Sequence, residues 1–372
     1  MRQSNTIDNS MLFRVTAVSI CSVIAVAVLI LARSFLIPLA WSLLIALASY
    51  RMLNTIEQKF RISRMITSFL YVIFILLVIL LLFYFFYAEI SSVVTGMPSF
   101  QDKVVAVYDN ITASLAGYGV HAPTIDLSKV NNWVTEHSDL VSKSVMAVGK
   151  AMGDIFLVGT YLFFILYYRD NYHYYIRIRE KTEEGYTRGI MRIREVVGIV
   201  NNFLFGLFTM TLMLAVMLFV IFLLIGLKYA LLFAVMVALL SLIPYIGSPL
   251  GMVIVVIFAL LTNDGMTVPL LSLAGILVSE TLKGIVIKPI IIGNKINLNG
   301  FVIFLSVIAG GLIWGVSGMI LFMPFAGIAK VLLEQNERTK PLAALFTMLP
   351  KDAQATIRGS SATSATRDAE GE

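Results

Sequence analysis

Long uncharged runs alternate with short charged segments along this chain. A bilayer-spanning helix needs roughly 20 apolar residues, so several of these runs are long enough to cross a membrane once, and the longest could cross twice. Counted between neighbouring charges, the runs are 15–32, 34–50, 65–88, 196–227, 229–263 and 296–329. The pattern predicts an all-α polytopic membrane protein with about eight membrane segments.

Composition agrees with this prediction. Of 372 residues, 59% are hydrophobic and 13% charged, whereas a soluble domain carries about 25% charged residues. The net charge of +6 is explained by Lys and Arg in cytoplasmic loops, so no nucleic-acid partner is expected. Cys21 is the single cysteine, which excludes an internal disulfide. A second span follows the first at once, so we expect an uncleaved N-terminal anchor.

Charge also predicts the orientation of the segments. Basic residues outnumber acidic ones in 51–64 and 169–195, which places both in the cytoplasm together with the N- and C-termini. Acids outnumber lysines in 89–150, which is expected to be a small, mostly helical extracytoplasmic insertion. The predicted units are 1–88 (tail and three spans), 89–150, 151–168 (fourth span), 169–203 (charged connector), 204–334 (transport core) and 335–372 (cytoplasmic, partly disordered tail).

The C-terminal half is interrupted by proline and glycine inside apolar sequence, most clearly in "LLSLIPYIGSPLG" at 239–251. Breaks free backbone amides and carbonyls, which is tolerated where they are buried in protein or line an aqueous cavity. Transporters bind solutes and ions at such discontinuous helices. We therefore expect broken or re-entrant helices here, including a hairpin at 310–318 within 301–334 in preference to one long kinked helix.

Two charges lie within this region. Glu280 and Lys283 are three residues apart, share a helix face and could pair. A charge inside the membrane is costly and indicates function, although snorkelling at the interface is the alternative. The candidate substrate or ion pathway comprises Pro244, Tyr245, Gly247, Pro249, Glu280, Lys283 and Pro289. The candidate hinge and packing positions are Gly293, Gly310, Gly311, Gly315, Gly318 and Pro324, for which close helix packing without gating is the alternative.

The sequence lacks the residues that several other classes of protein need. The sequence has no G-x-x-x-x-G-K-[ST] phosphate loop. Its three histidines lie outside the apolar segments, and no paired Cys or His set suggests a metal. Ser279 and Lys283 have the spacing of a Ser–Lys dyad, but that spacing is common by chance. We expect no enzyme activity, no metal and no cofactor.

The motifs of the C-terminal half resemble the autoinducer-2 exporter family of bacterial transporters. The shared elements are I-P-Y-I-G, a K-P-x-x-x-G segment in "IVIKPIIIGNKINLNG", a G-G-x-x-x-G-x-x-G run and a late Pro-Phe-Ala. The resemblance extends over roughly 15–345. It implies an inner-membrane permease and a homo-oligomer. Many members have His-Pro at Asn299–Gly300 and polar residues around Ser279–Thr281, which leaves the substrate open.

Three functions follow as hypotheses. The first is a secondary transporter in the bilayer that exports a small organic solute by alternating access, without its own ATPase. Some members of the family export autoinducer-2, and others are linked to sodium or lithium export in exchange for protons, so a cation/proton antiporter with Glu280 as the titrating group is the alternative. The third is a membrane scaffold that binds an envelope partner through 89–150.

Overall fold

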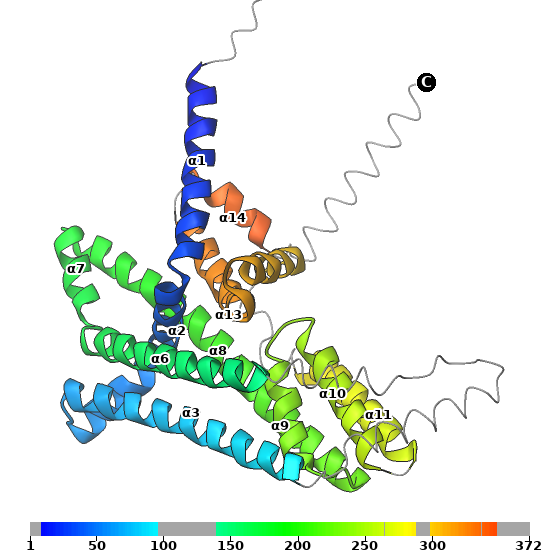
Figure 1. Ribbon diagram of the computed structural model, residues 1–372. Helices are drawn as coiled ribbons and strands as arrows, with labels where there is room; N and C mark the ends of the chain where they lie inside the picture. Colours follow the sequence, from blue (N-terminus) through cyan, green and yellow to red (C-terminus); the bar gives the residue numbers. More distant parts are fainter. Residues whose placement is uncertain (1–8, 96–138, 264, 288–297, 336, 348–372) are drawn as a thin grey trace, which may run out of the picture.

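In the computed structural model, every described element is helical (Figure 1). The structure describes residues 9–95, 139–263, 265–287, 298–335 and 337–347. Six described helices are long and apolar enough to cross a membrane, and three shorter apolar helices accompany them. The protein is therefore all-α and polytopic, as the sequence predicts.

The first two predicted spans are almost continuous. α1 (Asn9–Leu31) and α2 (Arg33–Phe60) are separated by Ala32 alone. Pro38 lies inside α2, where the hydroxyl of Ser42 donates a hydrogen bond of 2.7 Å to the Pro38 carbonyl.

α2 also extends into the charged segment 51–64, because its helix continues to Phe60. Leu53 is 2% exposed and packs in a cluster with Val72, Leu162 and Leu166. Val72 belongs to α3 (Arg64–Thr95), and the two leucines belong to α6 (Asp139–Tyr167). The three helices pack on one another, and this contact extends α2 beyond its apolar run.

α6 begins inside the predicted insertion 89–150, and α3 extends into its first residues; 96–138 lie outside the described residues. α7 (Asn171–Arg179) and α8 (Glu183–Ile225) follow. At 1.5 Å per residue, α8 is about 65 Å long, roughly twice the hydrocarbon thickness of a bilayer. It crosses the boundary predicted at 203–204, so the charged connector and the fifth span are one helix.

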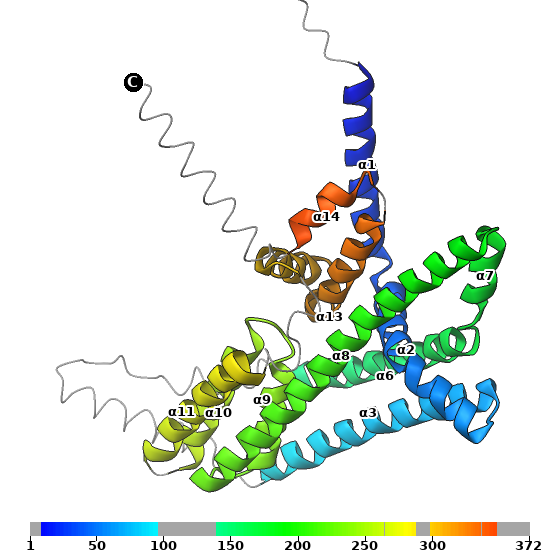
Figure 2. The ribbon, with the colours of Figure 1, turned by 180° about the vertical axis from the view of Figure 1, so that it is seen from behind.

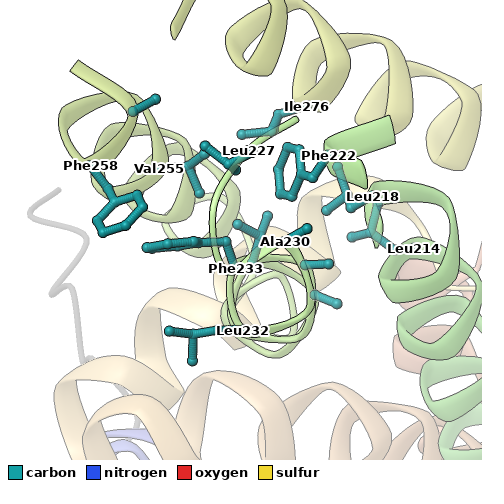
Figure 3. Close-up of a cluster of buried hydrophobic side chains, with 14 residues drawn as sticks. Leu214, Leu218, Phe222, Leu227, Ala230, Leu232, Phe233, Val255, Phe258 and Ile276 are labelled. Atoms are coloured by element: carbon teal, nitrogen blue, oxygen red, sulfur yellow. The ribbon is translucent and has the colours of Figure 1, made fainter. Parts of the chain in front are cut away.

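The next elements are α9 (Ala230–Leu240), α10 (Gly247–Thr262), α11 (Thr267–Leu282) and the π-helical turn η1 (Lys283–Ile287). Side chains of α8, α9, α10 and α11 meet in one buried cluster (Figure 3). Lipid tails are as apolar as these side chains, so close van der Waals contact stabilises the cluster more than water exclusion does. Its labelled members include Leu218, Phe222, Phe233, Val255 and Ile276.

α9 and α10 form an antiparallel helical hairpin. Near its tip, a Cβ on Gly251 would lie 3.1 Å from the side chain of Val237, and further out the rings of Phe233 and Phe258 are 4.3 Å apart. The helices have 11 and 16 residues, which makes them about 16 and 24 Å long. Each is shorter than the roughly 30 Å of a hydrocarbon core, which agrees with the expected re-entrant segments.

α13 (Gly300–Glu334) is a helical hairpin too. Its two arms carry one label, but the helix breaks between them at Gly315. Gly315 has φ 61° and ψ −141°, a conformation open essentially to glycine alone. A Cβ on Gly310 would lie 2.2 Å from the carbonyl oxygen of Gly318, whereas eight residues of straight helix span about 12 Å. The predicted hairpin at 310–318 is confirmed.

The α13 hairpin lies beside α2 and α8, next to α14 (Lys340–Phe346), as Figure 2 shows. It contacts α1, α2 and α8, and α14 covers it. The indole of Trp314 donates a hydrogen bond of 2.9 Å to the Leu29 carbonyl of α1. Gly311 lies against Met319, and Pro324 is buried in the second arm.

Replacing Gly310 with Ala should destabilise the protein by about 1–3 kcal/mol, because the added methyl group has no room against the opposite backbone. Thermal unfolding in detergent, followed by fluorescence-detected size exclusion, measures this loss. Gly198→Ala in α8 is the matched control, since nothing lies within 4 Å of its added Cβ. Equal melting temperatures for the two variants would contradict a tightly closed hairpin.

Candidate functional site

The apolar hairpin breaks at its tip, between the end of α9 at Leu240 and the start of α10 at Gly247. The chain turns through short-range hydrogen bonds, of which Ile243 N to Leu240 O (2.9 Å) and Gly247 N to Ile243 O (3.0 Å) are two. A Cβ on Gly247 would lie 1.7 Å from the Leu240 carbonyl oxygen, so only glycine fits this approach. The turn thereby satisfies backbone groups locally while it interrupts the helix.

Tyr245 adopts an unusual backbone conformation in this turn. Its φ is 66°, a left-handed value that is uncommon for a residue with a bulky side chain. The side chain is 63% exposed, and its ring meets Phe304 of α13 edge-on with 5.7 Å between centroids. Strained backbone of this kind collects at ligand sites and moving parts.

The turn borders a cavity of about 450 Å³, a size typical of small-molecule sites. α8 forms one wall with Phe203, Leu207, Met210 and Thr211, and the hairpin tip forms another with residues 241–245, 248 and 249. Glu280, Lys283 and Gly284 enclose it from α11 and η1, and Ile303 and Met323 from α13. Four separate segments of the C-terminal half therefore meet at one hollow.

The polar centre of the cavity is an ion pair. Lys283 Nζ lies 2.5 Å from Glu280 Oε2, and Ser248 Oγ donates a hydrogen bond of 2.8 Å to Glu280 Oε1. The two charged side chains are 19% and 21% exposed. Each oxygen of the carboxylate thus has one partner, and its negative charge is balanced at contact distance. The site can exchange these partners for a polar solute or a cation.

The π-helical turn positions the lysine. Lys283 starts η1, directly after α11 ends at Leu282. Such turns are rare, and they occur frequently at functional sites. The ammonium contacts Glu280 rather than Ser279, whose hydroxyl is fully buried and has no hydrogen-bond partner among the described residues. The arrangement is that of an ion pair and not of a Ser–Lys dyad.

The cavity gathers five of the candidate pathway residues, namely Pro244, Tyr245, Pro249, Glu280 and Lys283. Gly247 lies beside it and forms the close turn. Pro289 and Gly293 fall outside the described residues. Gly310, Gly311, Gly315 and Gly318 serve the α13 hairpin and do not line the cavity, and Pro324 follows the lining residue Met323. A role of these residues in transport stays a prediction.

Sequence reasoning missed Ser248 and Thr211. Ser248 lies between the candidate residues Gly247 and Pro249 in the motif at 239–251. This position was the one feature of the sequence that could have identified it. Its contact with Glu280 joins residues 32 positions apart. Thr211 lies in an uncharged run of α8 that also contains Thr209, so the sequence alone does not single it out.

Known proteins resemble this chain over most of its length. The model of the AI-2E family transporter matches residues 19–338. The AI-2 transport protein TqsA of Escherichia coli is 22% identical over 86% of this chain and 92% of its own. YueF of Bacillus subtilis, named for transport without a stated solute, is 23% identical over 65% of this chain and 68% of its own. The helical membrane fold and this match agree: the chain belongs to the AI-2E family of membrane transporters.

Proposed function

We propose that this protein is a secondary transporter of the bacterial inner membrane that exports a small polar solute through the cavity at the hairpin tip. The observation that carries the proposal is the Glu280–Lys283 ion pair, hydrogen-bonded to Ser248 where an apolar helical hairpin is broken. A charged pair at such a break is costly for stability. Contact between this ion pair and a transported solute explains why the protein contains the pair despite that cost.

Alternating access fits the construction of the cavity. The hairpin tip and α11 form one side, while α8 and α13 form the other. Because α8, α9, α10 and α11 share one buried cluster, a small shift of α13 against that cluster opens or closes the cavity without unfolding either. The chain has no phosphate loop of its own, so an ion gradient or the solute gradient supplies the driving force.

The lining favours an uncharged, hydroxyl-rich solute. Hydroxyl groups of Thr211, Ser241, Tyr245 and Ser248 surround one balanced ion pair. Such groups both donate and accept hydrogen bonds, which suits a sugar-like molecule. Because TqsA is named for AI-2 transport, autoinducer-2 is the first solute to test.

A second candidate is a sodium or lithium/proton antiporter. The observation in its favour is that Glu280 is the one carboxylate among the residues that line the cavity. A single carboxylate that exchanges Lys283 and Ser248 for a cation, and then takes up a proton, is sufficient for exchange. The scaffold hypothesis concerns 89–150, most of which lies outside the described residues.

Glu280→Gln separates the two candidates. In everted vesicles or proteoliposomes, an antiporter moves protons when sodium or lithium is added, and the amide variant loses this movement because it cannot titrate. Proton movement is read from a pH-sensitive dye, and autoinducer-2 flux is measured on the same vesicles. Solute export that survives in Glu280→Gln, with no cation-dependent proton movement in the wild type, would eliminate the antiporter.

Ser248→Ala tests whether the hydrogen bond to the carboxylate matters for transport. Removing a hydrogen bond to a charged group costs about 1.5–3 kcal/mol, so the apparent affinity for the transported species should fall at least about tenfold. Ser306→Ala is the control, since its hydroxyl bonds only Val302 O of its own helix. Equal transport by both variants would remove Ser248 from the proposed site.

The proposed topology places the N- and C-termini in the cytoplasm and 89–150 outside. Tyr229 Oη donates to the Ser92 carbonyl at 2.9 Å, so the open end of the α9–α10 hairpin lies on the side of that insertion. On a Cys21→Ser background, Lys228→Cys should react with an impermeant maleimide in spheroplasts, whereas Lys59→Cys should react only after lysis. Both positions are exposed. The reverse labelling pattern would invert the orientation.

A further inference from the structure

A second and larger cavity, of about 700 Å³, lies away from the ion pair. It is enclosed by α2, the end of α6, α7, the beginning of α8 and the end of α13. α7 joins α6 to α8 at this end of the molecule (Figure 1). The proposed transport cavity shares none of its lining residues.

One wall of this cavity holds a buried arginine. The side chain of Arg169 is 4% exposed, and one of its terminal nitrogens pairs with Glu57. Its Nε and Nη1 atoms have no hydrogen-bond partner among the described residues, and its guanidinium lies 5.6 Å from the centre of the Tyr50 ring. Each buried polar group without a partner requires an explanation. Arg169 therefore brings to this wall a positive charge whose donors are only partly used by Glu57.

Two further arginines line the rim of the same cavity. Arg179 and Arg192 are exposed, and neither forms an ion pair within the described part of the chain. Among the described residues, Arg179 donates one hydrogen bond, of 3.4 Å, to the Tyr175 hydroxyl. Glu180 is the one acid that lines the cavity. With Glu57 behind Arg169, three positive charges face two negative ones, so the local balance favours an anion.

A neutral hydroxyl completes the polar end. Tyr172 donates a hydrogen bond of 2.9 Å to Tyr50. Burial, followed by this hydrogen bond, raises the pKa of the Tyr172 hydroxyl above its ordinary value. The hydroxyl therefore stays protonated at neutral pH and adds no negative charge that would repel an anion.

The rest of the cavity is aliphatic. Leu43 and Leu47 of α2, Ile165 and Leu166 of α6, and Val197 of α8 form this wall. A volume of about 700 Å³ far exceeds what an inorganic anion fills. Arginine binds phosphate in a bidentate manner, and basic pockets between membrane helices hold anionic lipid head groups. The chemistry is that of an amphiphile with one anionic end.

We propose that this cavity binds an anionic phospholipid of the surrounding bilayer. The phosphate contacts Arg179 and Arg192 beside the positive charge of Arg169, and an acyl chain lies against the aliphatic wall. The lipid joins α7 and the start of α8 to α2 and α6. The residues of this site are distinct from those of the proposed transport cavity.

Arg179→Ala/Arg192→Ala tests the proposal, because both side chains are exposed and their removal leaves the Arg169–Glu57 pair intact. Delipidated protein in neutral detergent is titrated with phosphatidylglycerol, phosphatidylcholine or inorganic phosphate, and its melting temperature is recorded. Phosphatidylglycerol should stabilise the wild type, and the double variant should bind it at least about tenfold more weakly. Phosphatidylcholine should stabilise the wild type less, and inorganic phosphate should not.

Arg177→Ala/Arg188→Ala is the matched control. It removes the same charge from the same two helices, but these arginines pair with Glu183 and Glu184 and do not line the cavity. It should bind phosphatidylglycerol like the wild type. If the test variant does not fold, Leu43→Trp narrows the aliphatic wall and should weaken binding without a change of charge. Equal binding by test and control variants, equal stabilisation by phosphatidylcholine, or stabilisation by phosphate alone would overturn the proposal.

Discussion

The structure of the C-terminal half depends on one constraint: a backbone amide or carbonyl in hydrocarbon must find a partner within the protein. A proline in an apolar helix removes one amide donor, so the carbonyl four residues before it needs another partner or the helix breaks. Here the chain turns over 241–246, and amides of the turn bond to carbonyls two to four residues back. The turn requires Gly247 against the Leu240 carbonyl. Because of this turn, α9 and α10 are two short antiparallel helices with a cavity at their tip.

Most of the fold was predictable because the membrane imposes it. Uncharged runs locate the helices, and the glycine run at 310–318 located the second hairpin. Helix ends were less predictable where charge was taken as the sign of a loop. Residues 51–60 carry charges, yet they stay helical because Leu53 packs against α3 and α6 while Arg51 and Lys59 are exposed. The last turns of α2 are therefore amphipathic, with apolar side chains against the protein and charged side chains exposed.

The candidate site was predictable in its parts and not in its assembly. Proline, glycine and embedded charges are visible in any sequence, and Glu280 and Lys283 share a helix face by spacing alone. The hydrogen bond from Ser248 depends on how α10 packs on α11, which no local rule contains. The π-helical turn at Lys283 and the left-handed Tyr245 are likewise consequences of tertiary packing.

α8 links the two cavities physically. It contributes residues 189–197 to the phospholipid cavity and 203–211 to the ion-pair cavity, and it is continuous between them. The second arm of α13 does the same, with Met323 at one cavity and Ile328 at the other. A continuous helix cannot tilt at one end without moving the next turns. A lipid in the proposed phospholipid site would therefore also restrain the wall that the proposed alternating access has to move.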